Sequence, residues 1–210
     1  STVLYRLFYI FSLLIISNIS LADKDHINLL IYGDSISAGY GMDTEKQWSE
    51  ELKKILIEEK IGLTIINKSL SGETTGGGLS RLEKIIDNSK PSYVLIELGG
   101  NDALRGYPPA KIKNNIEEMI NLSIKKGVKV LLMQIRILPN YGRRYQTSFE
   151  SLYKEVSEEN NIPLIPFMLN DIALNKELML DDGIHPNETA QPLIAEFLYT
   201  NLLPLMSEVD

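Results

Sequence analysis

Five short apolar runs alternate with longer amphipathic stretches along most of this 210-residue chain. The apolar runs do not alternate polar and apolar residues, which is typical of parallel strands that are covered on both faces. The stretches between them carry apolar residues at the three- and four-residue spacing of one helical face. The expected strands are 27–32, 63–67, 93–98, 128–135 and 162–167. The expected helices are 45–60, 77–88, 109–126, 145–160 and 188–206.

Strands that alternate with helices form βαβ units and a parallel sheet. The pattern therefore predicts an α/β fold, a three-layer α/β/α sandwich with a five-stranded parallel sheet, flavodoxin-like in size. Gly62 and Gly127 lie where two of the helices should end. No stretch has the composition of a linker and no internal repeat is present, so residues 23–210 are expected to form a single domain.

The first 22 residues have a different pattern. Arg6 precedes an apolar stretch over 7–16 that only Ser12 interrupts, and residues 20–22 (Ser-Leu-Ala) have the small-x-small pattern of a cleavage site. A spanning helix needs about 20 apolar residues, which this stretch does not supply. We therefore expect a cleaved secretory signal peptide over 1–22, no stable membrane insertion after cleavage, and, in a bacterium with two membranes, a periplasmic protein.

Charge and composition exclude several classes of function. The chain has 21 Lys and Arg against 28 Asp and Glu, a net charge of −7, which argues against a nucleic-acid partner. The absence of cysteine excludes disulfides, thiolate metal sites and a cysteine nucleophile. The two histidines, His26 and His185, are too few for a His-rich metal cluster. We expect no metal and no cofactor.

Small polar residues follow the expected strands at the edge of the sheet where α/β proteins bind their ligands. Ser35, Gly72 and Asn101 follow the first three strands, and Asp182 and His185 come after the last one. Each has an ordinary structural interpretation. Ser35 and Asn101 are good helix N-caps, Gly72 suits a turn, and Asp182 suits a loop.

His185 favours a catalytic interpretation, because an aspartate three residues earlier, with Gly183 between them, can reach its Nδ1 atom. The opposite ring nitrogen would then accept a proton from Ser35, as in a Ser-His-Asp triad. Asp181 is an alternative to Asp182 with a spacing one residue longer. His26 precedes the first strand, at the opposite edge of the sheet, so we expect it to be structural.

Acyl transfer also needs hydrogen-bond donors for the oxyanion that forms on the substrate. Three donors are available on neighbouring loops: the backbone N–H groups of Ser35 and Gly72 and the side-chain amide of Asn101. Gly72 leaves the approach of the substrate open because it has no Cβ. The amide of Asn101 does not titrate and remains a donor at every pH.

These residues resemble the four sequence blocks of the SGNH (GDSL-like) hydrolases. The matching segments are Gly33-Asp34-Ser35-Ile36-Ser37, Gly72, Gly99-Gly100-Asn101-Asp102 and Asp182-Gly183-Ile184-His185-Pro186. The stretches 98–107 (LGGNDALRGY) and 132–145 (LMQIRILPNYGRRY) are similar to the subgroup of periplasmic thioesterases, lysophospholipases and arylesterases. The resemblance implies that Ser35 is the nucleophile, His185 the base and Asp182 its orienting acid, with Ser35, Gly72 and Asn101 forming the oxyanion hole.

The expected reaction is hydrolysis of acyl esters and thioesters, such as acyl-CoA thioesters, lysophospholipids and aryl esters, through an acyl-serine intermediate. Candidate substrate-binding residues follow the same strands: Arg105, Tyr107, Ile135, Ile137 and Tyr141. The order Ile137-Leu138-Pro139 departs from the subgroup, in which Leu-Pro is followed by a small residue. We expect a monomer whose partner is a small acyl substrate, with transient lipid contact at most.

Three other functions are compatible with parts of the pattern. A flavodoxin-like sheet can bind a flavin, although Asp34 would place a carboxylate where the phosphate should lie. A non-catalytic binding module could keep the fold. A sugar O-acetyl esterase would use the same residues on a different substrate.

Overall fold

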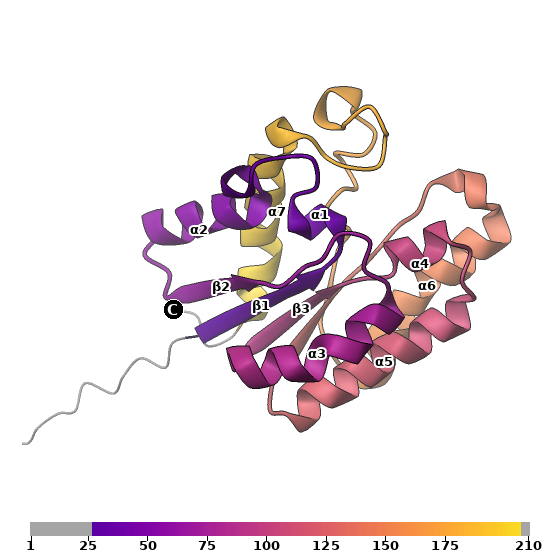
Figure 1. Ribbon diagram of the computed structural model, residues 1–210, viewed down its shortest axis with the longest axis horizontal. Coiled ribbons are helices and arrows are strands. Elements are labelled where there is room, and N and C mark those ends of the chain that lie inside the picture. Colours follow the sequence, from indigo (N-terminus) through magenta and orange to yellow (C-terminus); the bar gives the residue numbers. More distant parts are fainter. Residues whose placement is uncertain (1–26, 207–210) are drawn as a thin grey trace, which may run out of the picture.

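The computed structural model describes residues 27–206. The predicted signal peptide and His26 lie outside these residues. The centre of the fold is one parallel sheet of five strands in the order β2-β1-β3-β4-β5, the order of flavodoxin-like folds (Figure 1). The strands are β1 (Ile27–Gly33), β2 (Leu63–Asn67), β3 (Tyr93–Glu97), β4 (Lys129–Met133) and β5 (Leu164–Ile165). The predicted α/β/α class and five-stranded parallel sheet are confirmed.

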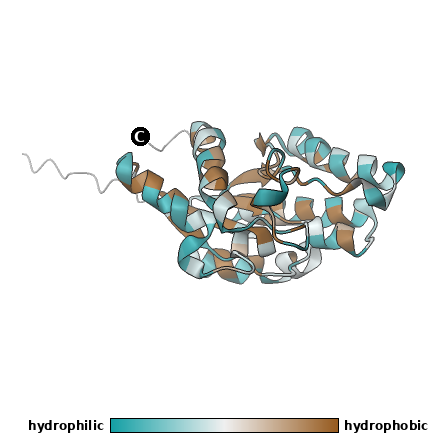
Figure 2. Ribbon diagram, turned by 90° about the horizontal axis from the view of Figure 1, so that it is seen from above, coloured by the Kyte–Doolittle hydropathy of each residue, from teal (hydrophilic) through white to brown (hydrophobic). Residues whose placement is uncertain are grey.

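Helices cover both faces of the sheet, as the continuous apolar strands require. On one face α2 (Trp48–Glu58) packs against α7 (Gln191–Leu202). On the other face α5 (Pro109–Lys125) packs between α3 (Thr75–Ser89) and α6 (Arg143–Asn160). Figure 2 shows that the apolar residues gather in the interior and the hydrophilic residues on the outer helix surfaces.

The central strands are almost wholly buried. In β3 every residue is buried, and in β1 the last five are. Burial of these aliphatic side chains from both sides supplies the main favourable free energy of folding, at about 25 cal/mol for each Å² of apolar surface. Within residues 27–206, no helix has the length and apolar character needed to cross a bilayer.

The structure corrects several predicted boundaries. Strand β5 pairs only through two residues, because Pro163 and Pro166 on either side have no N–H to donate to the sheet. Two short helices, α1 (Ser35–Ala38) and α4 (Gly100–Leu104), were not predicted, because four or five residues carry no detectable helical period. The remaining 3-10 turns are Thr44–Lys46, Pro139–Tyr141, Lys176–Leu178, Glu188–Ala190 and Leu203–Leu205.

The two predicted helix-ending glycines differ in outcome. Gly127 follows α5 with φ +77°, the left-handed conformation that glycine adopts without strain. Gly62 does not have this conformation; the left-handed residue after α2 is Lys60, with φ 58°. The predicted use of Gly62 as the helix-ending residue was therefore wrong.

Candidate active site

Ser35, His185 and Asp182 form a continuous chain of hydrogen-bonding atoms. His185 Nε2 lies 2.8 Å from Ser35 Oγ, and His185 Nδ1 lies 2.7 Å from Asp182 Oδ2. Ser35 begins the helix after β1, and the other two precede α7, so the fold brings together residues 150 positions apart. Both segments lie at the carboxyl end of the sheet (Figure 1).

Local hydrogen bonds hold Asp182 in position. Its Oδ1 atom accepts the backbone N–H groups of Ile184 at 2.8 Å and His185 at 3.0 Å. Gly183 between them has φ +67°, which lets the chain turn back toward the carboxylate. Partial burial raises the pKa of Asp182, but the hydrogen bonds from His185 and Ile184 outweigh it and lower the pKa to about 2. Asp182 is the partner of His185, rather than Asp181.

Backbone and aromatic contacts fix the segment around the imidazole. Leu180 donates its N–H to the His185 carbonyl at 2.8 Å, and Asn187 donates to the Leu178 carbonyl at 2.8 Å. The Tyr40 ring lies over His185, with 4.2 Å between ring centroids and 31° between planes. The sequence offered no signal for this tyrosine, because its contact lies far along the chain.

Ser35 is the first residue of α1 and is not its N-cap. The cap is Asp34, whose Oδ1 accepts the Ile36 N–H at 3.0 Å. The Ser35 hydroxyl is thereby left to contact His185. A backbone N–H in the first turn of a helix has no acceptor within that helix. The turn can therefore direct the N–H of Ser35 at a ligand.

Asn101 lies in the first turn of α4, and its side-chain amide donates to Asp34 Oδ2 at 3.1 Å. An amide carries two N–H groups, so this contact orients the side chain and leaves a second donor. Gly72 lies in the loop after β2 with φ +78°, and a Cβ there would meet no atom within 4 Å. Its backbone conformation is what requires glycine. Arg105 Nη2 approaches the Gly72 carbonyl at 3.4 Å, which joins this loop to α4.

A pair of buried carboxyl groups, Asp34 and Glu97, lies next to the segment that carries Ser35. Glu97 is 2% exposed, and its Oε2 accepts the Ser37 hydroxyl at 2.7 Å and the Asp34 N–H at 3.4 Å. Burial, with the Asp34 charge as a smaller contribution, raises the pKa of Glu97 well above its ordinary value. Burial also raises the pKa of Asp34, to about 6, against the hydrogen bonds that stabilise its charged form. Burial therefore favours the neutral form of Glu97 over its charged form.

Sequence reasoning missed Glu97. Its only signal was a single carboxylate at the end of an otherwise apolar strand, two residues before Gly99.

A third buried carboxylate connects two neighbouring loops. Asp102 accepts the Thr75 N–H at 2.8 Å and the Thr75 hydroxyl at 2.6 Å, and Asn115 donates to that hydroxyl oxygen at 2.9 Å. Asp102 follows Asn101, and Thr75 begins α3 shortly after Gly72. The two segments that carry candidate oxyanion donors are thus fastened to each other.

A cavity of about 390 Å³ opens beside Ser35 and His185. Most of its walls are aliphatic or aromatic, contributed by the segments that follow β4 and β5. Its apolar lining residues are Ile36, Leu104, Ile135, Ile137, Leu138, Phe167, Leu169, Ala173, Leu174, Met179 and Ile184. The lining also includes Arg136, Gln146 and Glu150, and the catalytic candidate Asn101.

The structure places two of the five substrate-binding candidates at the cavity beside Ser35 and the other three elsewhere. Ile135 and Ile137 line the cavity with Ser35. Arg105 lies against the Gly72 loop, and the Tyr107 carbonyl accepts the Tyr145 hydroxyl at 2.6 Å, a contact that holds its loop in place. Tyr141 lines a different groove and does not line the cavity beside Ser35.

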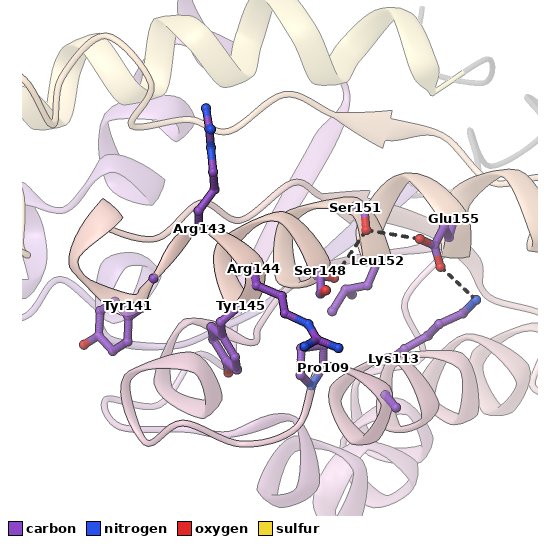
Figure 3. A pocket seen from close by; sticks show the side chains of 12 residues that line it. Pro109, Lys113, Tyr141, Arg143, Arg144, Tyr145, Ser148, Ser151, Leu152 and Glu155 are labelled. Atoms are coloured by element: carbon purple, nitrogen blue, oxygen red, sulfur yellow. Dashed lines mark hydrogen bonds and ion pairs between the residues drawn. The ribbon is translucent and has the colours of Figure 1, made fainter.

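That second groove, of about 820 Å³, lies along α6 beside the start of α5 (Figure 3). Arg143 and Arg144 both line it, but Figure 3 shows their side chains pointing in different directions. Lys113 pairs with Glu155 at 3.3 Å, which removes another cation from the groove. The two arginines therefore do not converge on one anionic ligand. Among residues 27–206, no group of three or more His, Cys, Asp or Glu side chains could hold a metal ion.

A serine, an imidazole and a carboxylate in this order, at the ligand-binding edge of a doubly wound sheet, are characteristic of a serine hydrolase. Residues 31–191 match the GDSL-like Lipase/Acylhydrolase family. The chain belongs to that family, and it is an enzyme that hydrolyses acyl esters.

Relatives along nearly the whole chain support the assignment. An arylesterase of Vibrio mimicus is 45% identical over 91% of this chain and 96% of its own length. Thioesterase 1/protease 1/lysophospholipase L1 of Escherichia coli K12 is 40% identical over 85% of each chain.

Among solved structures, the esterase EstA of Pseudoalteromonas, inhibited by monoethylphosphonate, is 40% identical over 86% of this chain and 98% of its own, with a TM-score of 0.84.

Proposed function

We propose that Ser35 is the nucleophile of this hydrolase, with His185 as general base and Asp182 as the acid that orients and stabilises the imidazolium. The observation that carries this proposal is the unbroken chain of contacts from Asp182 through His185 to the Ser35 hydroxyl. The esterase EstA, which is similar to this chain, is inhibited by monoethylphosphonate. Phosphonates react with activated serine hydroxyls, which agrees with the proposal.

In the proposed reaction, Ser35 Oγ attacks the acyl carbonyl carbon while His185 Nε2 takes the hydroxyl proton. The oxyanion accepts hydrogen bonds from the N–H groups of Ser35 and Gly72 and from the Asn101 amide. The C–O or C–S bond to the leaving group breaks, and His185 returns the proton to the departing alcohol or thiol. Water then attacks the acyl-serine with His185 again as base, which releases the acid and restores Ser35.

The proposed substrates are esters and thioesters with an apolar acyl chain, in the class of aryl esters, acyl-CoA thioesters and lysophospholipids. The aliphatic walls around Ile135 and Ile137 suit such a chain, since each buried CH₂ contributes about 0.8 kcal/mol. A sugar O-acetyl esterase is not favoured by the comparisons. A flavin-binding or non-catalytic role is not favoured either, because the similar proteins are named for esterase and thioesterase activities.

We further propose that residues 1–22 are a signal peptide, that 23–210 form the mature single domain, and that this domain acts as a periplasmic monomer without a cofactor. The pattern of Arg6, the apolar stretch and Ala22 supports export. N-terminal sequencing of the exported protein tests the cleavage site, and light scattering tests the monomer. A mature chain that begins elsewhere, or a stable dimer, would contradict the respective part.

The decisive experiment is the intact mass of the protein after treatment with a fluorophosphonate. We expect one adduct on the wild type and none on Ser35→Ala. Ser80→Ala is the matched control, because the Ser80 hydroxyl is exposed on α3 and bonds only locally, to the Gly77 carbonyl at 2.7 Å; it should keep the adduct. An unmodified wild type, or an adduct that persists on Ser35→Ala, would show that Ser35 is not the nucleophile.

A further inference from the structure

Four exposed apolar side chains surround the entrance of the catalytic cavity. Leu104, Leu138, Leu174 and Ile184 all line the cavity, yet 43%, 48%, 89% and 38% of their surfaces remain exposed. They come from four separate segments: the end of α4, the segment after β4, the segment after β5, and the turn before His185. The entrance therefore has apolar side chains contributed from several sides, which we call the entrance rim.

The exposure of the entrance rim is not explained by packing of the core. Leu174 in particular is almost as exposed as in an unfolded chain, so its side chain gains little from folding. Scattered exposed apolar residues are common on proteins, whereas a group gathered at one site indicates a surface that something else covers. Here the group continues inward into apolar walls that would hold an acyl chain.

The charges at this site restrict what can cover the rim. Among the described residues that line the cavity, Arg136 is the only lysine or arginine, and it donates to Asn170 Oδ1 at 2.9 Å. Glu150 adds an acidic group to the same lining, and the whole chain has a net charge of −7. An anionic surface would be repelled at long range. An electrically neutral apolar surface carries no such penalty.

We propose that the entrance rim docks the enzyme on a zwitterionic lipid–water interface, where the acyl chain of an aggregated substrate passes directly into the cavity. This inference rests on the proposed function as a hydrolase of esters and thioesters with an apolar acyl chain. When an acyl chain leaves a lipid aggregate for water, each methylene lowers the equilibrium constant of that transfer about fourfold. For an eight-methylene chain the penalty is on the order of 10⁴–10⁵, which direct contact between lipid and cavity avoids.

The test compares Leu174→Ser and the double variant Leu138→Ser/Leu174→Ser with Ile57→Ser. Ile57 is 76% exposed on α2 and does not line the cavity, so it is a matched apolar-to-polar control. Binding to phosphatidylcholine vesicles is measured by co-sedimentation. We expect wild type and Ile57→Ser to bind equally, Leu174→Ser about tenfold more weakly, and the double variant more weakly still. Thermal melting of all variants establishes that they are folded.

A second readout is the ratio of the rate on lysophosphatidylcholine micelles to the rate on monomeric p-nitrophenyl acetate. We expect this ratio to fall in the rim variants in the same order as vesicle binding, and to be unchanged in Ile57→Ser. Vesicle binding needs no catalysis. A wild type that binds vesicles but hydrolyses neither substrate would therefore refute the proposed function while leaving the docking surface in place.

Three outcomes would overturn the inference. The first is a wild type that does not bind phosphatidylcholine vesicles. The second is tighter binding to phosphatidylglycerol vesicles, which would show that charge, not the rim, drives attachment. The third is concentration-dependent dimerisation that Leu174→Ser abolishes, which would show that a second copy of the chain covers the rim.

Discussion

Replacement of Glu97 by glutamine tests whether burial favours the protonated form of this carboxyl group, which lies next to the segment that carries Ser35. The amide is isosteric with a protonated carboxyl group, and its oxygen can accept the same hydrogen bonds from the Ser37 hydroxyl and the Asp34 N–H. Glutamine cannot ionise. The substitution therefore removes the titration of Glu97 and retains the contacts of its neutral form.

The expected sign follows from the direction of the pKa shift. Burial raises the pKa of Glu97 in the folded chain above its unfolded value of 4.5. The folded chain therefore holds a proton that the unfolded chain has lost, and the free energy of unfolding falls as the pH rises from 4.5 toward the folded pKa. The slope is about 1.4 kcal/mol per pH unit. Asp34 adds a second slope, but only below its folded pKa of about 6.

Urea unfolding between pH 5 and pH 8 measures the effect. Near pH 5 we expect the free energies of unfolding of Glu97→Gln and wild type to agree within about 1 kcal/mol. As the pH rises above 4.5, the wild type should lose stability relative to the variant, by about 1.4 kcal/mol for each pH unit up to the folded pKa of Glu97. Glu58→Gln, an exposed glutamate on α2, should follow the wild-type curve. Parallel curves for wild type and Glu97→Gln over the whole range from pH 5 to pH 8 would refute the reasoning.

Two further substitutions examine the oxyanion donor and the turn that positions it. Asn101→Ala should lower kcat on the order of 10²–10³-fold with a small effect on KM, because it removes a donor that acts mainly in the transition state. Steady-state kinetics test this, with Asn114→Ala at an exposed position as the control. Near wild-type turnover of Asn101→Ala would contradict the prediction. Gly99→Ala should destabilise the fold by about 3 kcal/mol, since Gly99 has φ +121° and a Cβ there would overlap the Tyr153 hydroxyl. Thermal or urea unfolding measures the effect, and Gly62→Ala is the control because a Cβ at Gly62 meets no atom within 4 Å. Equal stability of the two variants would argue against strain at Gly99.

Much of the fold could be predicted because its signals are local. The apolar run 93–98 contains β3, and the spacing of apolar residues over 109–126 identifies α5. Local sequence patterns did not predict the features that tertiary contacts decide. Run 128–135 is longer than β4, since Ile135 belongs to the cavity wall and not to the sheet. A continuous apolar run does not show which of its residues belong to the sheet and which belong to a cavity wall.

The candidate site shows the same division. Asp182 and His185 are three residues apart, so their contact could be expected from turn geometry alone. The contact of Glu97 with Asp34 and the tilted ring contact of Tyr40 with His185 join distant segments, and a single sequence carries no record of such pairs. The sequence singled out Ser35 as the candidate nucleophile, which stays a prediction, and the cap of its helix is Asp34 and not Ser35 itself.

The hydrogen bonds that Thr75 donates to Asp102 have a consequence for attempts to change the substrate range of this enzyme. They connect the loop that carries Gly72 to the helix that carries Asn101. A substitution in either segment would therefore disturb the candidate oxyanion donors of both. The opposite boundary consists of the segments 135–142 and 166–180, for which the described residues show no hydrogen bond to Gly72 or Asn101. Libraries that seek new acyl-chain lengths should therefore vary these segments and leave 70–78, 99–105 and 181–186 constant. Natural divergence of substrate range should be concentrated on the same side.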